Sequence, residues 1–110
     1  MPRRQRPVEV TGFRIAPAGN GRLAASGELE FATAAAALEA GLSLLGPGQA
    51  WTIDLAGITS GDSAGLAVLV EWMSAARARG ASVRYESVPA QVLAIARISD
   101  LEELLLGQGA

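Results

Sequence analysis

The chain has 110 residues, of which half are hydrophobic, and this is enough for one domain with a single core. It contains no cysteine and no histidine, so disulfides and thiolate catalysis are excluded, and the commonest metal ligand and general base is missing. The net charge is −2, the nine positive charges are all arginines that are mostly scattered, and only five residues are aromatic, which argues against nucleic-acid binding.

The two ends of the chain are expected to lie outside the domain. Residues 1–7 carry three arginines without the apolar segment of a secretory signal, which predicts a flexible, solvated tail. Weak attraction of this tail to anionic lipid headgroups is the other interpretation. The longest apolar stretch, residues 64–76, is shorter than the roughly 20 residues that span a bilayer. We therefore expect a cytoplasmic protein with one domain over residues 8–106 and a flexible end over 107–110.

The first elements are predicted to be a hairpin, a helix and a central strand. Residues 13–16 and 22–27 flank the turn sequence Pro-Ala-Gly-Asn-Gly, which is typical of a β-hairpin. Leucines recur at helical spacing within residues 34–45, and the Gly-Pro-Gly that follows ends the pattern. Residues 51–55 are almost continuously apolar, as in a buried central strand covered by helices. Residues 57–61 are then expected to form a connecting loop.

Helices and strands continue to alternate in the second half. Residues 63–79 predict a helix that Gly80 ends, and residues 81–87 alternate as a strand does. Pro89 favours the start of a third helix over residues 89–98, and residues 100–106 predict one or two further turns. The order ββαβαβα predicts an α/β fold, in which a mixed sheet has helices packed mainly on one face.

The second helix has an unusual outer face. At the helical period, its sheet-facing stripe consists of Leu66, Leu69, Val70, Met73 and Ala76. The opposite stripe consists of Ala64, Val68, Glu71 and Ala75, with Trp72 at its margin. An apolar outer surface with a tryptophan at its edge is typical of a protein interface. The alternative is that Trp72 packs against a loop or a neighbouring helix.

The start of this helix concentrates polar groups at one point. Asp62 is expected to be the N-cap, because its carboxylate can accept from unpaired N–H groups and its charge suits the helix dipole. Together with Ser63 it forms a point that suits binding or phosphorylation. A nucleophilic serine would need a general base, and the chain has neither histidine nor lysine. Asp54 and Asp62 as a catalytic or metal-binding pair lack further ligands, so we predict no enzyme activity, no cofactor and no metal.

Two motifs at this junction resemble a known family. Residues 53–58, Ile-Asp-Leu-Ala-Gly-Ile, and residues 62–66, Asp-Ser-Ala-Gly-Leu, are similar to the strand ending in Asp-Leu and the helix-opening Asp-Ser-Ser-Gly-Leu of the STAS domain. That family is named for sulfate transporters and anti-sigma factor antagonists. Residues 26–30 are similar to its Gly-Glu-Leu-Asp segment, and residues 80–83 resemble its next strand. Gly61 departs from the pattern, which has an apolar residue there. The resemblance covers nearly the whole chain and implies a STAS-type mixed sheet.

Within the family, the chain resembles the small cytoplasmic subunit of the bacterial Mla phospholipid-trafficking ABC transporter, through its length, its Gly-Leu-Ala and its leucine-rich ending. The resemblance implies a non-catalytic subunit that binds and regulates the ATPase of a lipid-transporting ABC complex maintaining outer-membrane lipid asymmetry. Such a subunit is cytoplasmic and is held at the inner face of the membrane by its partner. Ser63 occupies the position of a threonine that these subunits need for contact with the ATPase.

The alternative is an anti-sigma factor antagonist that binds an anti-sigma kinase. The serine that is phosphorylated in those proteins corresponds to Ala64, which has no hydroxyl, so phosphorylation would have to fall on Ser63. Under either interpretation the predicted partner-binding residues are Asp62, Ser63, Ala64, Val68, Glu71 and Trp72.

Overall fold

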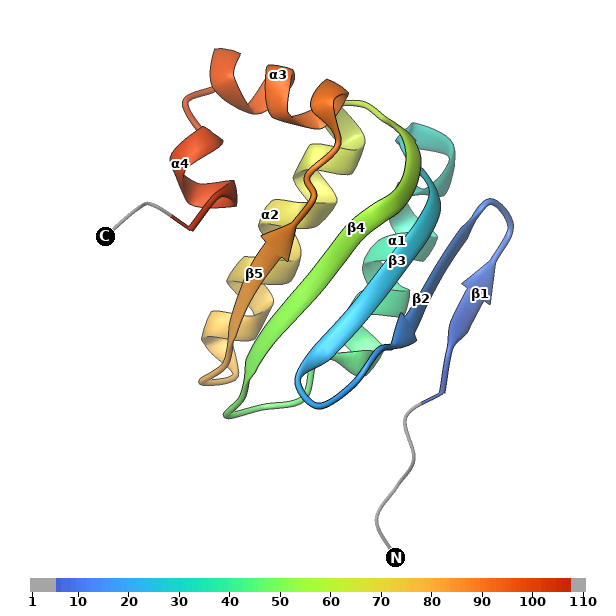
Figure 1. Cartoon of the computed structure of the whole chain (residues 1–110), viewed down its shortest axis with the longest axis vertical. Coiled ribbons are helices and arrows are strands. Elements are labelled where there is room, and N and C mark those ends of the chain that lie inside the picture. Colours follow the sequence, from blue (N-terminus) through green and yellow to red (C-terminus); the bar gives the residue numbers. More distant parts are fainter. Residues whose placement is uncertain (1–5, 108–110) are drawn as a thin grey trace, which may run out of the picture.

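Five strands form one mixed sheet, and their order across the sheet follows their order along the chain (Figure 1). The computed structural model describes residues 6–107, so the parts of the expected tails at 1–5 and 108–110 lie outside the described residues. The strands are β1 (Val8–Val10), β2 (Phe13–Pro17), β3 (Arg22–Leu29), β4 (Ala50–Gly61) and β5 (Ser82–Glu86). The helices are α1 (Phe31–Leu44), α2 (Ser63–Ala78), α3 (Ala90–Ile98) and α4 (Glu102–Leu105).

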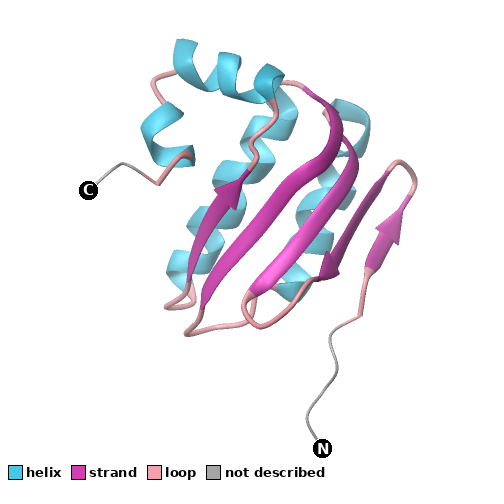
Figure 2. Ribbon diagram, viewed as in Figure 1, coloured by secondary structure: helices cyan, strands magenta, loops and turns pink. Residues whose placement is uncertain are grey.

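The sheet has an antiparallel part and a parallel part. Strands β1, β2 and β3 pair antiparallel, whereas β3 pairs parallel with β4 and β4 parallel with β5. Each parallel connection contains a helix, because α1 joins β3 to β4 and α2 joins β4 to β5. Figure 2 shows both helices on the same face of the sheet. The predicted α/β fold, with a mixed sheet and helices mainly on one face, is confirmed. No helix within residues 6–107 combines the length and the apolar character needed to cross a bilayer.

One prediction about the strands was wrong, and one strand was missed. Residues 57–61, expected to be a loop, continue β4, because β3 extends beside them and pairs Gly27 with Ile58 and Leu29 with Gly61. Backbone pairing with a neighbouring strand here overrides the low strand preference of glycine and serine. The three-residue β1 was not predicted at all, and it forms because β2 offers it an antiparallel edge. The hairpin, the first three helices and the short final turn lie close to the predicted positions.

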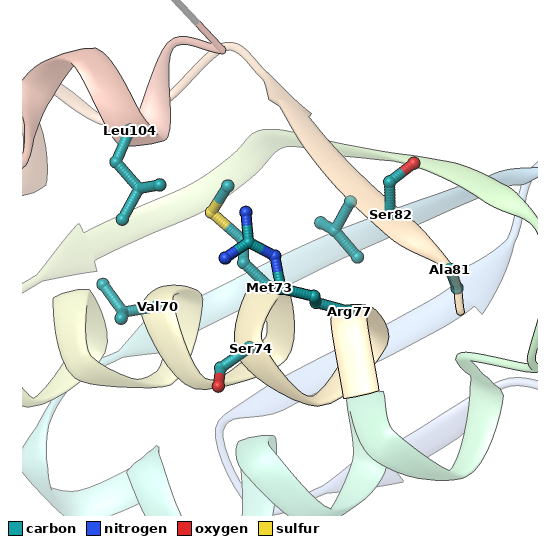
Figure 3. A pocket seen from close by; sticks show the side chains of 8 residues that line it. Val70, Met73, Ser74, Arg77, Ala81, Ser82 and Leu104 are labelled. Atoms are coloured by element: carbon teal, nitrogen blue, oxygen red, sulfur yellow. The ribbon is translucent and has the colours of Figure 1, made fainter. Parts of the chain in front are cut away.

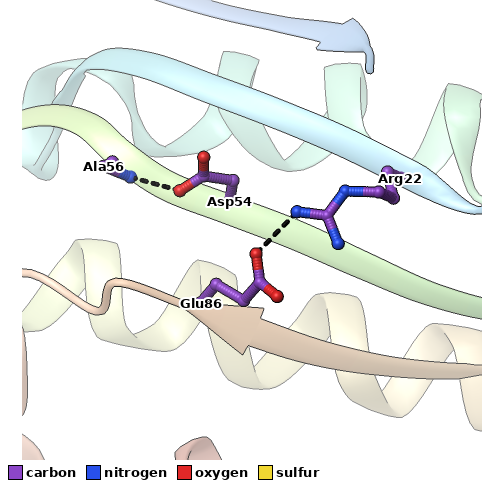
Figure 4. Close-up of polar contacts among 4 residues, drawn as sticks. All are labelled: Arg22, Asp54, Ala56 and Glu86. Atoms are coloured by element: carbon purple, nitrogen blue, oxygen red, sulfur yellow. Dashed lines mark hydrogen bonds and ion pairs between the residues drawn. The ribbon is translucent and has the colours of Figure 1, made fainter. Parts of the chain in front are cut away.

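The core lies between the sheet and helices α1 and α2. On β3 and β4 the side chains of Leu23, Ile53 and Leu55 are at most 1% exposed, whereas the intervening Ala24 and Asp54 are only half-buried. This alternation is expected of strands with one covered face. The opposite face of the sheet carries polar side chains, and Figure 4 shows an ion pair there that crosses β4.

That ion pair joins Arg22 of β3 to Glu86 of β5, with 2.6 Å between Nη2 and Oε1. The hydrogen bond from Arg22 lowers the pKa of Glu86 and raises that of the arginine. Both side chains are about two-fifths exposed, so solvent screens the pair and its contribution to stability is small. Asp54, between them, accepts a hydrogen bond from the backbone N–H of Ala56 at 2.9 Å (Figure 4).

Trp72 lies between the two covering helices and not on the surface. Its side chain is 0% exposed, its indole Nε1 donates to the backbone oxygen of Leu38 at 3.1 Å, and its ring centroid lies 6.2 Å from that of Phe13. Gly41 of α1 makes room for the ring, because a Cβ at that position would lie 2.2 Å from Trp72 Cε2. The expected exposure of Trp72 and of Val68, which is 4% exposed, was therefore wrong. The alternative, packing against a neighbouring helix, is confirmed for Trp72.

Candidate partner-binding site

The starts of α1 and α2 lie next to each other at one edge of the sheet. Strand β3 ends at Leu29 and β4 ends at Gly61, and these two residues are partners in the parallel register. Since each strand leads directly into a helix, the two helix N-termini come together beyond this pair. The N-termini carry unpaired N–H groups and partial positive charge, so the edge needs acceptors.

Asp62 supplies acceptors to both helices. Its Oδ1 accepts from the backbone N–H groups of Ala64 at 2.9 Å and Gly65 at 3.1 Å in α2. Its Oδ2 accepts from the N–H of Phe31, the first residue of α1, at 3.0 Å. These bonds, that from Phe31 first, lower the pKa of the Asp62 carboxyl because they favour its charged form. The predicted N-cap of α2 is confirmed, and the second cap, on α1, was not predicted.

Further hydrogen bonds tie the two strand ends to the helix starts. The Ser60 hydroxyl of β4 donates to Glu30 Oε2 at 3.1 Å, just before α1. The backbone N–H of Glu30 donates to Thr33 Oγ1 at 3.1 Å, and the Thr33 hydroxyl donates back to the Glu28 carbonyl at 2.8 Å. The edge is therefore held in one arrangement by bonds that run from strand to helix.

Two glycines allow this close approach. A Cβ on Gly65, in the first turn of α2, would lie 1.9 Å from the backbone oxygen of Leu29, so only glycine fits there without a shift of the helix. A Cβ on Gly61 would lie 2.5 Å from Cγ2 of Val92 in α3. The departure at Gly61 from the apolar residue of the family motif thus coincides with close packing of α3 on the end of β4.

The predicted site residues separate into surface and core. Ser63 is exposed and Asp62 and Ala64 are half-buried at the shared helix starts, whereas Glu71 is exposed about two turns further along α2. Among the described residues, no hydrogen bond engages the hydroxyl of Ser63. Val68 and Trp72 are buried and cannot contact a partner without unfolding.

The structure adds Phe31 to this surface. It is the first residue of α1, its backbone is bonded to Asp62, and its side chain is 84% exposed. The helix predicted over 34–45 left Phe31 in a connecting segment, so it was missed. The signal that could have identified Phe31 as a surface residue is its position directly after Glu30 and outside the leucine repeat of the helix.

The accessible groups of this arrangement are suited to binding. Within residues 6–107, no group of three histidine, cysteine, aspartate or glutamate residues could hold a metal ion. Both oxygens of Asp62 are occupied by backbone N–H groups, so this carboxylate is a structural acceptor. What remains accessible is an aromatic ring, a free hydroxyl and a small residue on two helix starts of fixed geometry.

Comparison with known proteins agrees with the motifs. A family model described as the MlaB STAS domain matches residues 4–107. Among solved structures, the murine anion transporter Solute Carrier 26 family member A9, in its inward-facing state, is similar with a TM-score of 0.56 and 19% identity. The likeness covers 80% of this chain and 14% of the transporter chain, and at this identity it concerns the fold alone. A search of curated proteins found no match.

Proposed function

The chain belongs to the STAS domain family, and from this membership we propose that it is a non-catalytic subunit that binds and regulates the ATPase of a lipid-transporting ABC complex of the Mla type. The family model is described by the name of such a subunit, MlaB. The observation that carries the proposal is that Phe31, which is 84% exposed, is bonded through its backbone to Asp62, and that Asp62 is followed by Ser63 with its free hydroxyl. An exposed aromatic ring on a rigid backbone is suited to fill a partner's pocket, and aromatic residues are enriched in interfaces.

Rigidity of this surface supports a regulatory role. Asp62 joins the starts of α1 and α2, and the Trp72 ring packs against Gly41 between the same helices. A partner that docks on both helix starts meets a preformed surface, so little ordering entropy is lost on binding. By binding one conformation of the ATPase more tightly than another, such a rigid subunit would shift the ATPase equilibrium. The membrane association of the subunit would then come through this partner.

The test is copurification from native cells with the tagged chain and three charge-introducing variants. Phe31→Glu and Ser63→Glu place a carboxylate on the proposed surface, and Ile98→Glu is the matched control, since Ile98 is 86% exposed on α3. We expect wild type and Ile98→Glu to recover an ABC ATPase, and the two site variants to lose it while retaining their circular dichroism spectra. Equal recovery with Phe31→Glu and wild type would disprove the surface. Absence of any ABC ATPase from the wild-type eluate would disprove the function.

The second candidate is an anti-sigma factor antagonist, and the free, exposed hydroxyl of Ser63 favours it. A phosphate there would add about −1.5 to −2 charge beside the carboxylate of Asp62 and could change partner choice. Mass spectrometry of the same eluates distinguishes the two candidates. An anti-sigma kinase among the partners, with phosphate on Ser63, would establish the second candidate and overturn the first.

A further inference from the structure

A hollow separate from the helix starts lies along the second half of α2. It has a volume of about 250 Å³, lies between α2, β5 and α4, and is partly open to solvent (Figure 3). Its lining includes Val70, Met73, Ser74 and Arg77 of α2, Val83 of β5 and Leu104 of α4. None of these residues belongs to the surface proposed to bind the ATPase, so the hollow requires a separate explanation.

The walls of the hollow are mainly apolar. Val70 and Met73 pack against the core but are only half-buried, and Leu104 is 40% exposed. Its neighbour Leu105 is 0% exposed and anchors α4 in the core, which fixes Leu104 toward the hollow. Figure 3 shows Leu104 opposite Val70 and Met73. Apolar surface of these side chains is in contact with water. An apolar ligand would cover this surface and remove it from water.

One charged group reaches the hollow, and it has no protein partner. Arg77, in the last turn of α2, lines the hollow, and within residues 6–107 its guanidinium makes no hydrogen bond or ion pair. The guanidinium groups of Arg22, Arg79 and Arg97 are bonded within the described chain, whereas that of Arg14, outside the hollow, is unbonded like that of Arg77. A free guanidinium beside apolar walls is suited to a carboxylate or phosphate, which it can bind through two parallel N–H groups.

From this combination we propose that the hollow binds a small anionic amphiphile, whose single alkyl chain lies against Val70, Met73 and Leu104 and whose acidic head group meets Arg77. The volume has room for about eight groups the size of a water molecule, so the hollow holds the head group and the first carbons of one alkyl chain, and a ten-carbon chain extends past its open side. A cationic amphiphile of the same length would be repelled by Arg77.

The test is a calorimetric and NMR titration of the isolated chain with decanoate and with decyl phosphate, below their micelle concentrations. Decyltrimethylammonium carries the same chain with the opposite charge, and acetate and inorganic phosphate supply the head groups alone. We expect at least one of the two anionic decyl compounds to bind saturably. We expect no binding of decyltrimethylammonium, acetate or inorganic phosphate. Binding of decanoate alone would identify a fatty-acid carboxylate as the ligand, and binding of decyl phosphate alone a phosphate head group.

Two arginine variants locate the site. Arg77→Gln removes the charge from the hollow, and Arg84→Gln removes another exposed arginine, which lies on β5 outside its lining. We expect Arg77→Gln to bind about tenfold more weakly and Arg84→Gln to bind as wild type does. Equal affinity of Arg77→Gln and wild type, binding of decyltrimethylammonium as tight as decanoate, or no saturable binding would each overturn the proposal. No ATPase is present, so the result is independent of the proposed partner.

Discussion

Substitution of Gly41 by alanine tests the contact between the two covering helices. Alanine has the higher helix propensity, and by this effect alone the variant would gain about 1 kcal/mol of stability. The new Cβ, however, would lie 2.2 Å from Cε2 and 2.3 Å from Nε1 of Trp72. Carbon atoms in contact are about 3.5–4.0 Å apart, so the ring and α1 would have to separate by more than about 1 Å.

The clash is expected to outweigh the gain in propensity. The indole cannot move aside, because it is 0% exposed, packs against Phe13 and is bonded to the Leu38 carbonyl. Overpacking of a rigid core site costs about 1–3 kcal/mol, and we take the upper end because both sides of the contact are rigid. After subtraction of the propensity gain, Gly41→Ala should lower the free energy of unfolding by about 2 kcal/mol.

The assay is urea unfolding followed by far-UV circular dichroism, with midpoints compared at a common slope. Ala35→Gly, on the exposed face of α1, measures the propensity difference in the same helix. Trp72→Phe removes the ring edge that meets Gly41, so the double variant should be more stable than the sum of the single effects predicts, by about 1–2 kcal/mol. The packing of the Trp72 ring against Gly41 would be refuted if Gly41→Ala stabilised the domain. It would also be refuted if the effects of Gly41→Ala and Trp72→Phe simply added.

Three further predictions concern the core and the helix starts. Gly65→Ala should destabilise the domain by more than about 2 kcal/mol, because its Cβ would lie 1.9 Å from the Leu29 oxygen; urea unfolding measures this, and a neutral effect would contradict the geometry. Tyr85→Phe should cost about 1 kcal/mol, since it removes the buried 2.6 Å bond to the Leu69 carbonyl, and thermal unfolding checks it. The lowered pKa of Asp62 means that its stabilisation is present above the unfolded value of about 3.9 and is lost as the pH falls through the folded value. Unfolding curves of wild type and Asp62→Asn should therefore differ near pH 6 and converge in acid, and a difference that does not shrink would refute this role.

The local elements could be predicted because their signals lie close together in the sequence. The turn between β2 and β3, the N-cap Asp62 and the leucine spacing of α1 each depend on a few neighbouring residues. The motif around Asp62 likewise identified the family, since a strand that leads directly into a helix needs an acceptor and a glycine at this junction. Strand β1 and the second half of β4 were missed because they exist only through pairing with a neighbour.

Burial of the second face of α2 could not be predicted from sequence. A small, apolar helix face with Trp72 beside it has the same periodicity whether another helix or another protein covers it. In the structure α1 covers the Trp72 side of that face, because Gly41 leaves a space for the indole, whereas Glu71 stays exposed. The same register of β3 against β4 brings the backbone of Phe31 within hydrogen-bond distance of Asp62, although 30 intervening residues separate them. Local sequence thus determined the elements, their caps and the family, whereas the tertiary structure decided which apolar side chains are buried and which remain for a partner, because burial depends on what distant segments place opposite each face.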